Sequence, residues 1–125
     1  MAKILIAEDE KDIRNLIKFT LQLDGHEVIA TQNGEEALQK VISERPDLIL
    51  LDIRMPKMTG YETCKKMKED ESLQNIPIIF LSAKGQDKEI QTGLDLGASK
   101  YILKPFSPNK LTADVNQILK NSLKQ

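Results

Sequence analysis

Polar side chains with a chemical use stand at four places in this chain, each directly after a short run of mostly aliphatic residues. In sequence order they are Glu8-Asp9, Asp52, Ser82 and Lys104. Carboxylates do not gather for stability, because two unit charges about 4 Å apart repel by roughly 4 kcal/mol at an effective dielectric near 20. Three acids with room for water suit Mg²⁺, and a hydroxyl and an ammonium opposite them suit a phosphoryl group. A carboxylate in such a site can itself be the nucleophile and form an aspartyl phosphate.

These residues can meet only if the elements that carry them lie side by side. Five short apolar runs, at residues 3–7, 27–30, 48–51, 78–82 and 100–103, predict β-strands. The third run is four consecutive large aliphatics and predicts a central strand buried on both faces. Helical spacing of apolar residues follows each run after a short connection, so we expect an α/β fold with a parallel sheet covered on both faces. Every strand-to-helix loop then opens on the same edge of the sheet, where ligands bind in such folds.

The helices show an inward stripe and recognisable ends. The residues expected on the stripes of the first, second, third and last helices are Ile13, Leu16, Ile17, Thr20 and Leu21; Ala37, Leu38, Val41 and Ile42; Tyr61, Cys64 and Met67; and Leu111, Val115, Ile118 and Leu119. Asp9 or Glu10 can cap the first helix, and Asn33 with Glu36 resembles a capping box for the second. The fourth helix carries Gly93 in its interior. This glycine either makes the helix marginal, so that it can switch, or permits close packing against a neighbour.

Composition sets the broad class. With 125 residues, 40% hydrophobic and 30% charged, the chain is expected to be one soluble domain, residues 1–125. A net charge of -1 offers no electrostatic footprint for nucleic acid, and no apolar run approaches the roughly 20 residues that span a membrane. The single cysteine, Cys64, suits a reducing compartment, so we expect a cytoplasmic protein with Cys64 in the core. His26 is expected to be solvated in a turn on the opposite edge of the sheet.

The motifs taken together resemble the response-regulator receiver domains of two-component signalling, most of all the single-domain chemotaxis regulators. The resemblance rests on Glu8-Asp9 after the first strand, Asp52 followed by Met55-Pro56 and Gly60, Ser82-Ala83 after the fourth strand, and Lys104-Pro105-Phe106 after the fifth. It covers the whole chain. It implies a doubly wound, flavodoxin-like (βα)5 fold with five parallel strands in the order 2-1-3-4-5.

The resemblance also implies a role for each residue. Asp52 would accept a phosphoryl group from a phosphohistidine on a sensor histidine kinase or a phosphotransfer protein. Asp9 and Asp52 would bind Mg²⁺ directly, Glu8 would act through water, and the backbone carbonyl of Arg54 would be a further ligand. Ser82 and Lys104 would hold the phosphoryl oxygens.

Further implied features concern the switch. Tyr101 would move inward with Ser82 in the active form, and the Lys104-Pro105 bond would be cis. Gly85 would give the loop after Ser82 freedom to move, and Arg54 and Lys84 are positions on which the lifetime of the phosphorylated state depends in this family. An unidentified output protein would bind the face formed by the fourth helix, fifth strand and fifth helix. The protein would catalyse its own phosphotransfer and autodephosphorylation, with no separate substrate turnover and no direct contact with nucleic acid or membrane.

The sequence departs from the family pattern at two positions and leaves rivals open. Glu8 replaces the commoner Asp, and Thr59 replaces the usual Asp before Gly60, although Thr still caps a helix. A haloacid-dehalogenase-type hydrolase would need a second Asp two residues after Asp52, where Arg54 stands. A flavodoxin-type electron carrier would need aromatic residues, which are only 4% of the chain. A receiver domain that belongs to a larger DNA-binding regulator is the remaining alternative.

Overall fold

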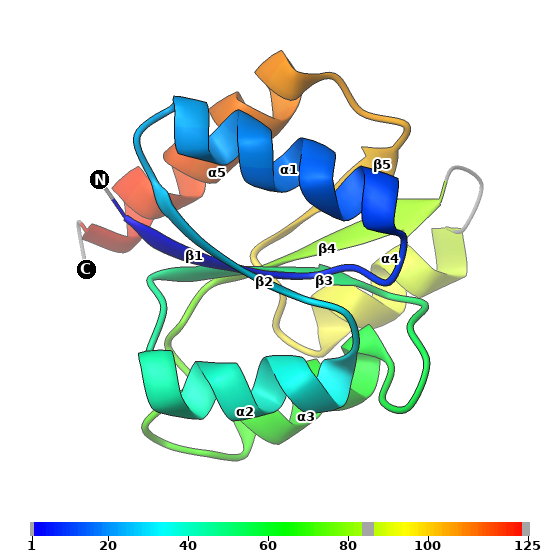
Figure 1. Cartoon of the computed structure of the whole chain (residues 1–125). Helices are drawn as coiled ribbons and strands as arrows, with labels where there is room; N and C mark the ends of the chain where they lie inside the picture. The colour runs from blue at the N-terminus through cyan, green and yellow to red at the C-terminus, as the bar shows by residue number, and fades with distance from the viewer. Residues whose placement is uncertain (1, 84–86, 124–125) are drawn as a thin grey trace.

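The structure, a computed structural model, describes residues 2–83 and 87–123, in which five strands alternate with five helices (Figure 1). The elements are β1 (Lys3–Ala7), α1 (Lys11–Leu23), β2 (Glu27–Thr31), α2 (Gly34–Glu44), β3 (Leu48–Asp52), α3 (Gly60–Lys68), β4 (Ile78–Ala83), α4 (Asp87–Asp95), β5 (Lys100–Lys104) and α5 (Pro108–Leu123). The predicted boundaries differ from these by one or two residues. Lys84 and Gly85, which we associated with the switch, lie outside the described residues.

The sheet is parallel throughout, with strand order β2-β1-β3-β4-β5, as predicted. Helices α1 and α5 cover one face, and α2 and α3 cover the other (Figure 1). All five residues of β3 are buried. Within β3, Leu48 and Leu50 join the core on the α1 and α5 side, whereas Ile49 and Leu51 join the core on the α2 and α3 side. The aliphatic run therefore serves two cores at once, which explains why it does not alternate with polar residues.

Two of the predicted core positions are wrong. Leu16 is 43% exposed and Ile42 is 51% exposed, although their neighbours Ile17 and Val41 are fully buried. Consecutive residues of a helix point about 100° apart, and the sheet covers only one side of α1 and of α2. One residue of each apolar pair therefore faces away from the core.

Helix capping follows the sequence in part. Asn33 caps α2 by accepting from the Glu36 N–H at 2.8 Å, and Thr59 with Glu62 forms a capping box at the start of α3. Glu10 stands at the N-cap position of α1, but its side chain makes no capping bond. Its backbone N–H donates instead to Glu8 Oε2 at 3.1 Å, which directs the Glu8 side chain towards the carboxyl edge of the sheet.

The prediction of a solvated His26 is wrong, since its side chain is only 7% exposed. Its Nδ1 accepts from the Ala2 N–H at 3.2 Å, and its Nε2 lies 3.0 Å from Asn116 Oδ1 and 3.2 Å from Asp24 Oδ2. Asn116 belongs to α5 and is 90 residues away in the sequence. The packing of α5 beside the turn after α1 therefore buries the His26 side chain, although the local sequence predicts an exposed turn.

Gly93 permits close packing. A Cβ placed on it would lie 2.6 Å from Cδ2 of Phe80, a buried residue of β4. No real Cβ contact is that short, so an alanine would force the Phe80 ring or α4 to move. Of the two readings of Gly93, the structure therefore favours close packing against a neighbour.

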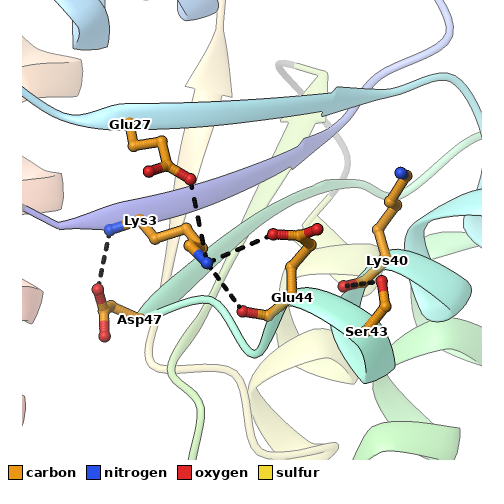
Figure 2. Close-up of polar contacts among 6 residues, drawn as sticks. All are labelled: Lys3, Glu27, Lys40, Ser43, Glu44 and Asp47. Carbon is orange, nitrogen blue, oxygen red and sulfur yellow. Dashed lines mark hydrogen bonds and ion pairs between the residues drawn. The ribbon is translucent and has the colours of Figure 1, made fainter.

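Lys3 makes several polar contacts at the edge of the sheet where the strands begin (Figure 2). Its Nζ lies 3.3 Å from Glu44 Oε1 and 4.0 Å from Glu27 Oε2, and it donates to the Glu44 carbonyl at 3.2 Å. Its backbone N–H donates to Asp47 Oδ2 at 2.8 Å. These contacts join β1, β2 and the connection before β3, at the edge remote from Asp52. Among the described residues, no helix has the length and apolar composition needed to cross a bilayer.

Candidate functional site

The parallel register brings the polar residues together at the carboxyl edge. Asp52 is the last residue of β3 and is paired with Leu81, so the next residue of β4, Ser82, lies beside it. Ala83 of β4 is in turn paired with Lys104, the last residue of β5. Glu8 follows β1 and donates its N–H to the Thr31 carbonyl of β2 at 3.1 Å. Residues separated by up to 96 positions in the sequence thus share one rim.

The side chains at this rim form a compact charged cluster. Carboxylate oxygens of Glu8, Asp9 and Asp52 lie within 4.8 Å of one another. The Nζ of Lys104 lies 2.7 Å from Glu8 Oε1 and 3.2 Å from Asp52 Oδ2. Glu8 is fully buried, Asp52 is 6% exposed and Ser82 is 1% exposed, whereas Asp9 is exposed. The cluster therefore combines three buried polar residues, Glu8, Asp52 and Ser82, with one acid that faces solvent.

A cavity of about 310 Å³ opens over Asp52. Its lining residues are Asp9, Glu10, Asp52, Ile53, Arg54, Leu81, Ser82 and Lys104. The backbone N–H of Arg54 donates to Asp52 Oδ1 at 3.3 Å, so both Asp52 oxygens have a partner, one from the backbone and one from Lys104. A small charged group that enters this cavity meets the Asp52 carboxyl group, the Ser82 hydroxyl and the Lys104 ammonium.

The electrostatics of the cluster are strongly perturbed. The pKa of Asp52 is raised to about 8, with burial as the largest cause. The hydrogen bond and negative charge of Glu8 also raise this pKa, and together they outweigh the lowering by Lys104. Burial alone lowers the pKa of Lys104, but its hydrogen bond to Glu8 and the charge of Asp52 outweigh burial and raise it. One ammonium therefore does not neutralise this set of acids.

The residues present fit a divalent cation with oxygen ligands. The acids lie close enough to share an ion, and the three carboxyl groups face a single lysine ammonium, that of Lys104. Hard cations such as Mg²⁺ take one or two carboxylates and keep several waters, which the exposed Asp9 and the cavity allow. Both oxygens of Glu8 are already engaged, by Lys104 and by the Glu10 N–H, so Glu8 suits an indirect contact better than a direct one.

The Lys104-Pro105 peptide bond is cis. Tyr101 is paired with Phe80 in the sheet and is 37% exposed, so it does not line the cavity. Cys64 is buried in the core, as expected, and burial raises the pKa of its thiol.

Sequence reasoning missed the second role of Gly60. A Cβ on this residue would lie 2.3 Å from the Asp52 carbonyl oxygen, and its N–H donates to the Ile53 carbonyl at 3.0 Å. Gly60 thus lets the chain fold back against the end of β3 and fixes the loop that carries Arg54. The only signal was a glycine after a helix cap, which does not reveal what the backbone approaches.

Comparison with known proteins agrees with this geometry. The sequence model described as "Response regulator receiver domain" matches residues 4–116. The chain is 42% identical over 120 residues to the alkaline phosphatase synthesis transcriptional regulatory protein PhoP of Bacillus subtilis, covering 96% of this chain and 49% of PhoP. It is 40% identical to the phosphate regulon transcriptional regulatory protein PhoB of Pseudomonas aeruginosa, covering 95% of this chain and 52% of PhoB.

Solved structures give the same picture. The chemotaxis response regulator CheY4 of Vibrio cholerae superposes with a TM-score of 0.89 at 35% identity, covering 94% of this chain and 98% of CheY4. The chain thus spans about half the length of the curated relatives it matches and nearly all of CheY4. Motifs, fold, acidic cluster and matches agree, and the chain belongs to the response regulator receiver domain family.

Proposed function

We propose that this domain is a phosphorylation switch that accepts a phosphoryl group on Asp52 in a Mg²⁺-dependent reaction. The donor is a phosphohistidine on a sensor histidine kinase or a phosphotransfer protein, the partner class of receiver domains. The observation that carries the proposal is the position of Asp52: a nearly buried carboxyl group at the end of β3, open to a cavity and 3.2 Å from Lys104. The fold does not need an aspartate at this buried position. Formation of an aspartyl phosphate does need one there.

The proposed transfer is a displacement at phosphorus. One Asp52 carboxylate oxygen attacks the phosphorus of the phosphohistidine, an O–P bond forms, and the N–P bond breaks with its electron pair left on the imidazole nitrogen. Asp52 must be ionised to attack, and a divalent cation held beside it would favour the ionised form. Asp9 and Asp52 would hold that cation directly, with the backbone carbonyl of Arg54, while Glu8 would contact it through water. The proposed ligand set agrees with the exposed Asp9 and the fully engaged Glu8.

The chain's own residues then hold the product. The Ser82 hydroxyl and the Lys104 ammonium line the same cavity as Asp52, where phosphoryl oxygens would arrive. Lys104 would leave its contact with Asp52 for the new oxygens, and Ser82 would donate to them. We propose that Tyr101 follows Ser82 inward, which would change the surface formed by α4, β5 and α5 for an output protein.

The test is intact-mass measurement after incubation with Mg²⁺ and acetyl phosphate or a phosphorylated histidine kinase. Wild type should gain one phosphoryl group, and Asp52→Asn should gain none. Asp12→Asn is the matched control, because Asp12 is an exposed acid on α1 close to the same rim. Phosphoryl gain by Asp52→Asn at the normal rate would refute the assignment.

A second proposal concerns the whole protein. PhoP and PhoB are named as transcriptional regulatory proteins, and the chain matches about half of each. These matches favour a receiver domain that controls a DNA-binding partner domain, whereas the match to CheY4 favours a domain that acts alone. An antibody against this domain would distinguish them in the source cells: a polypeptide roughly twice as long supports the regulator.

A further inference from the structure

The loop between β1 and α1 carries two of the three acids, and a residue outside the acidic cluster holds its backbone. Arg14, in the first turns of α1, donates from Nη1 to the Glu8 carbonyl at 3.0 Å and to the Asp9 carbonyl at 3.4 Å. The Arg14 side chain is half-buried. A single guanidinium nitrogen therefore bridges the two consecutive residues that present their carboxylates to the site.

Asp9 depends on this backbone contact more than Glu8 does. The Glu8 side chain is buried and is oriented by Lys104 and by the Glu10 N–H. The Asp9 carboxylate is exposed and has no hydrogen bond or ion pair within residues 2–83 and 87–123. Its direction is therefore set by the backbone on which it stands, and Arg14 is the side chain that holds this backbone.

The charge of Arg14 and its hydrogen bonds have opposite effects on the affinity for Mg²⁺. A guanidinium near the acids repels any other cation, so as a mere charge Arg14 weakens Mg²⁺ binding. As a hydrogen-bond donor to the two carbonyls it strengthens binding, because groups that orient metal ligands typically contribute tenfold or more to affinity. Replacement of Arg14 therefore distinguishes the two roles. Mg²⁺ binding becomes tighter if the charge dominates and weaker if the hydrogen bonds dominate.

We propose that Arg14 is a positioning residue for the divalent-cation site: it fixes the Glu8-Asp9 backbone so that the Asp9 carboxylate points into the cavity beside Asp52. This inference rests on the proposed Mg²⁺-dependent function. It assigns Arg14 no contact with the cation or with the phosphoryl group.

The experiment measures the Mg²⁺ dissociation constant by calorimetry for the full chain and for three variants. Arg14→Gln removes the charge and the bridge, and Arg14→Lys keeps the charge but replaces the planar donor group. Lys11→Gln is the control, because Lys11 is exposed, lies two residues after Asp9 and has no hydrogen bond or ion pair with the described residues. Urea midpoints in chelator, measured for each variant, report any general loss of stability.

We expect Arg14→Gln to weaken Mg²⁺ binding about tenfold, Arg14→Lys to weaken it by an intermediate factor, and Lys11→Gln to leave it unchanged or slightly tighter. The midpoints in chelator should stay close to that of wild type, while the Mg²⁺-induced rise in midpoint shrinks for the Arg14 variants alone. A dissociation constant for Arg14→Gln that is equal to or smaller than that of wild type would overturn the inference. Failure of wild type to bind Mg²⁺ would instead refute the proposed function, so the two failures are distinguishable.

Discussion

Asp52→Asn should stabilise the protein in the absence of metal. In the folded protein the pKa of Asp52 is about 8, against 3.8 as the ordinary value, with burial as the largest cause and Glu8 as the second. The folded state therefore holds a proton that the unfolded chain has released between about pH 4 and pH 8. Because the unfolded state binds fewer protons in this window, the free energy of unfolding falls as the pH rises through it.

The magnitude follows from the shift. At 1.36 kcal/mol per pH unit, a shift of this size costs the folded state about 4 kcal/mol by pH 7. Asparagine needs no proton uptake on folding, but it still buries an amide and loses the contact of the carboxyl group with Lys104. We therefore expect a net gain of about 1 to 3 kcal/mol at pH 7. Little or no gain is expected near pH 4, where the folded carboxyl group is neutral and the unfolded one is only about half ionised.

Urea unfolding in chelator tests this at several pH values. With an m-value of about 1 to 3 kcal/mol/M, the midpoint of Asp52→Asn should lie on the order of 1 M above wild type at pH 7. Asp12→Asn, which removes an exposed carboxylate on α1, should show no such gain. In Mg²⁺ at about ten times its dissociation constant, wild type should recover roughly 1.4 kcal/mol, and Asp52→Asn should recover less.

Two results would show that the reasoning is wrong. One is an equal midpoint for Asp52→Asn and wild type at pH 7 in chelator. The other is a gain of the same size at pH 4 and pH 7, which would trace the effect to packing and not to ionisation.

The other predictions concern Lys104, α4 and the output face. Lys104→Ala should still bind Mg²⁺ but lose the coupling of phosphorylation to conformational change, visible as unchanged amide exchange after beryllofluoride treatment. It should also lower the free energy of unfolding by about 3 kcal/mol, because the fully buried Glu8 loses its counter-charge; an unchanged urea midpoint would contradict this. Gly93→Ala should destabilise by about 1 to 3 kcal/mol because its Cβ overlaps the Phe80 ring, and a raised urea midpoint would exclude the overlap. In wild type, beryllofluoride with Mg²⁺ should change amide exchange in α4 and β5, and changes confined to α2 and α3 would place the output face elsewhere.

The sequence by itself was sufficient for the order of the elements and for the rim on which the polar residues meet. The aliphatic run in β3 predicts a strand buried on both faces, and short connections in an alternating pattern leave little choice but a parallel sheet. In a parallel sheet all strands end on the same edge, so Asp52, Ser82 and Lys104 had to share it. These features follow from the local periodicity of apolar residues and from the short connections, and both can be read directly from the sequence.

Only the tertiary structure decided which residues touch. Lys104 lies 2.7 Å from Glu8, Arg14 holds the carbonyls of the acidic loop, and His26 is enclosed through contact with Asn116. Gly93 likewise gained its meaning only from the Phe80 ring against it. Each of these contacts depends on how far one element slides or turns against another, a distance of a few ångströms that is set by the packing of the whole core. The pattern of apolar residues specifies which face of a helix is buried, but it does not specify that distance, and the chemistry of the rim depends on it.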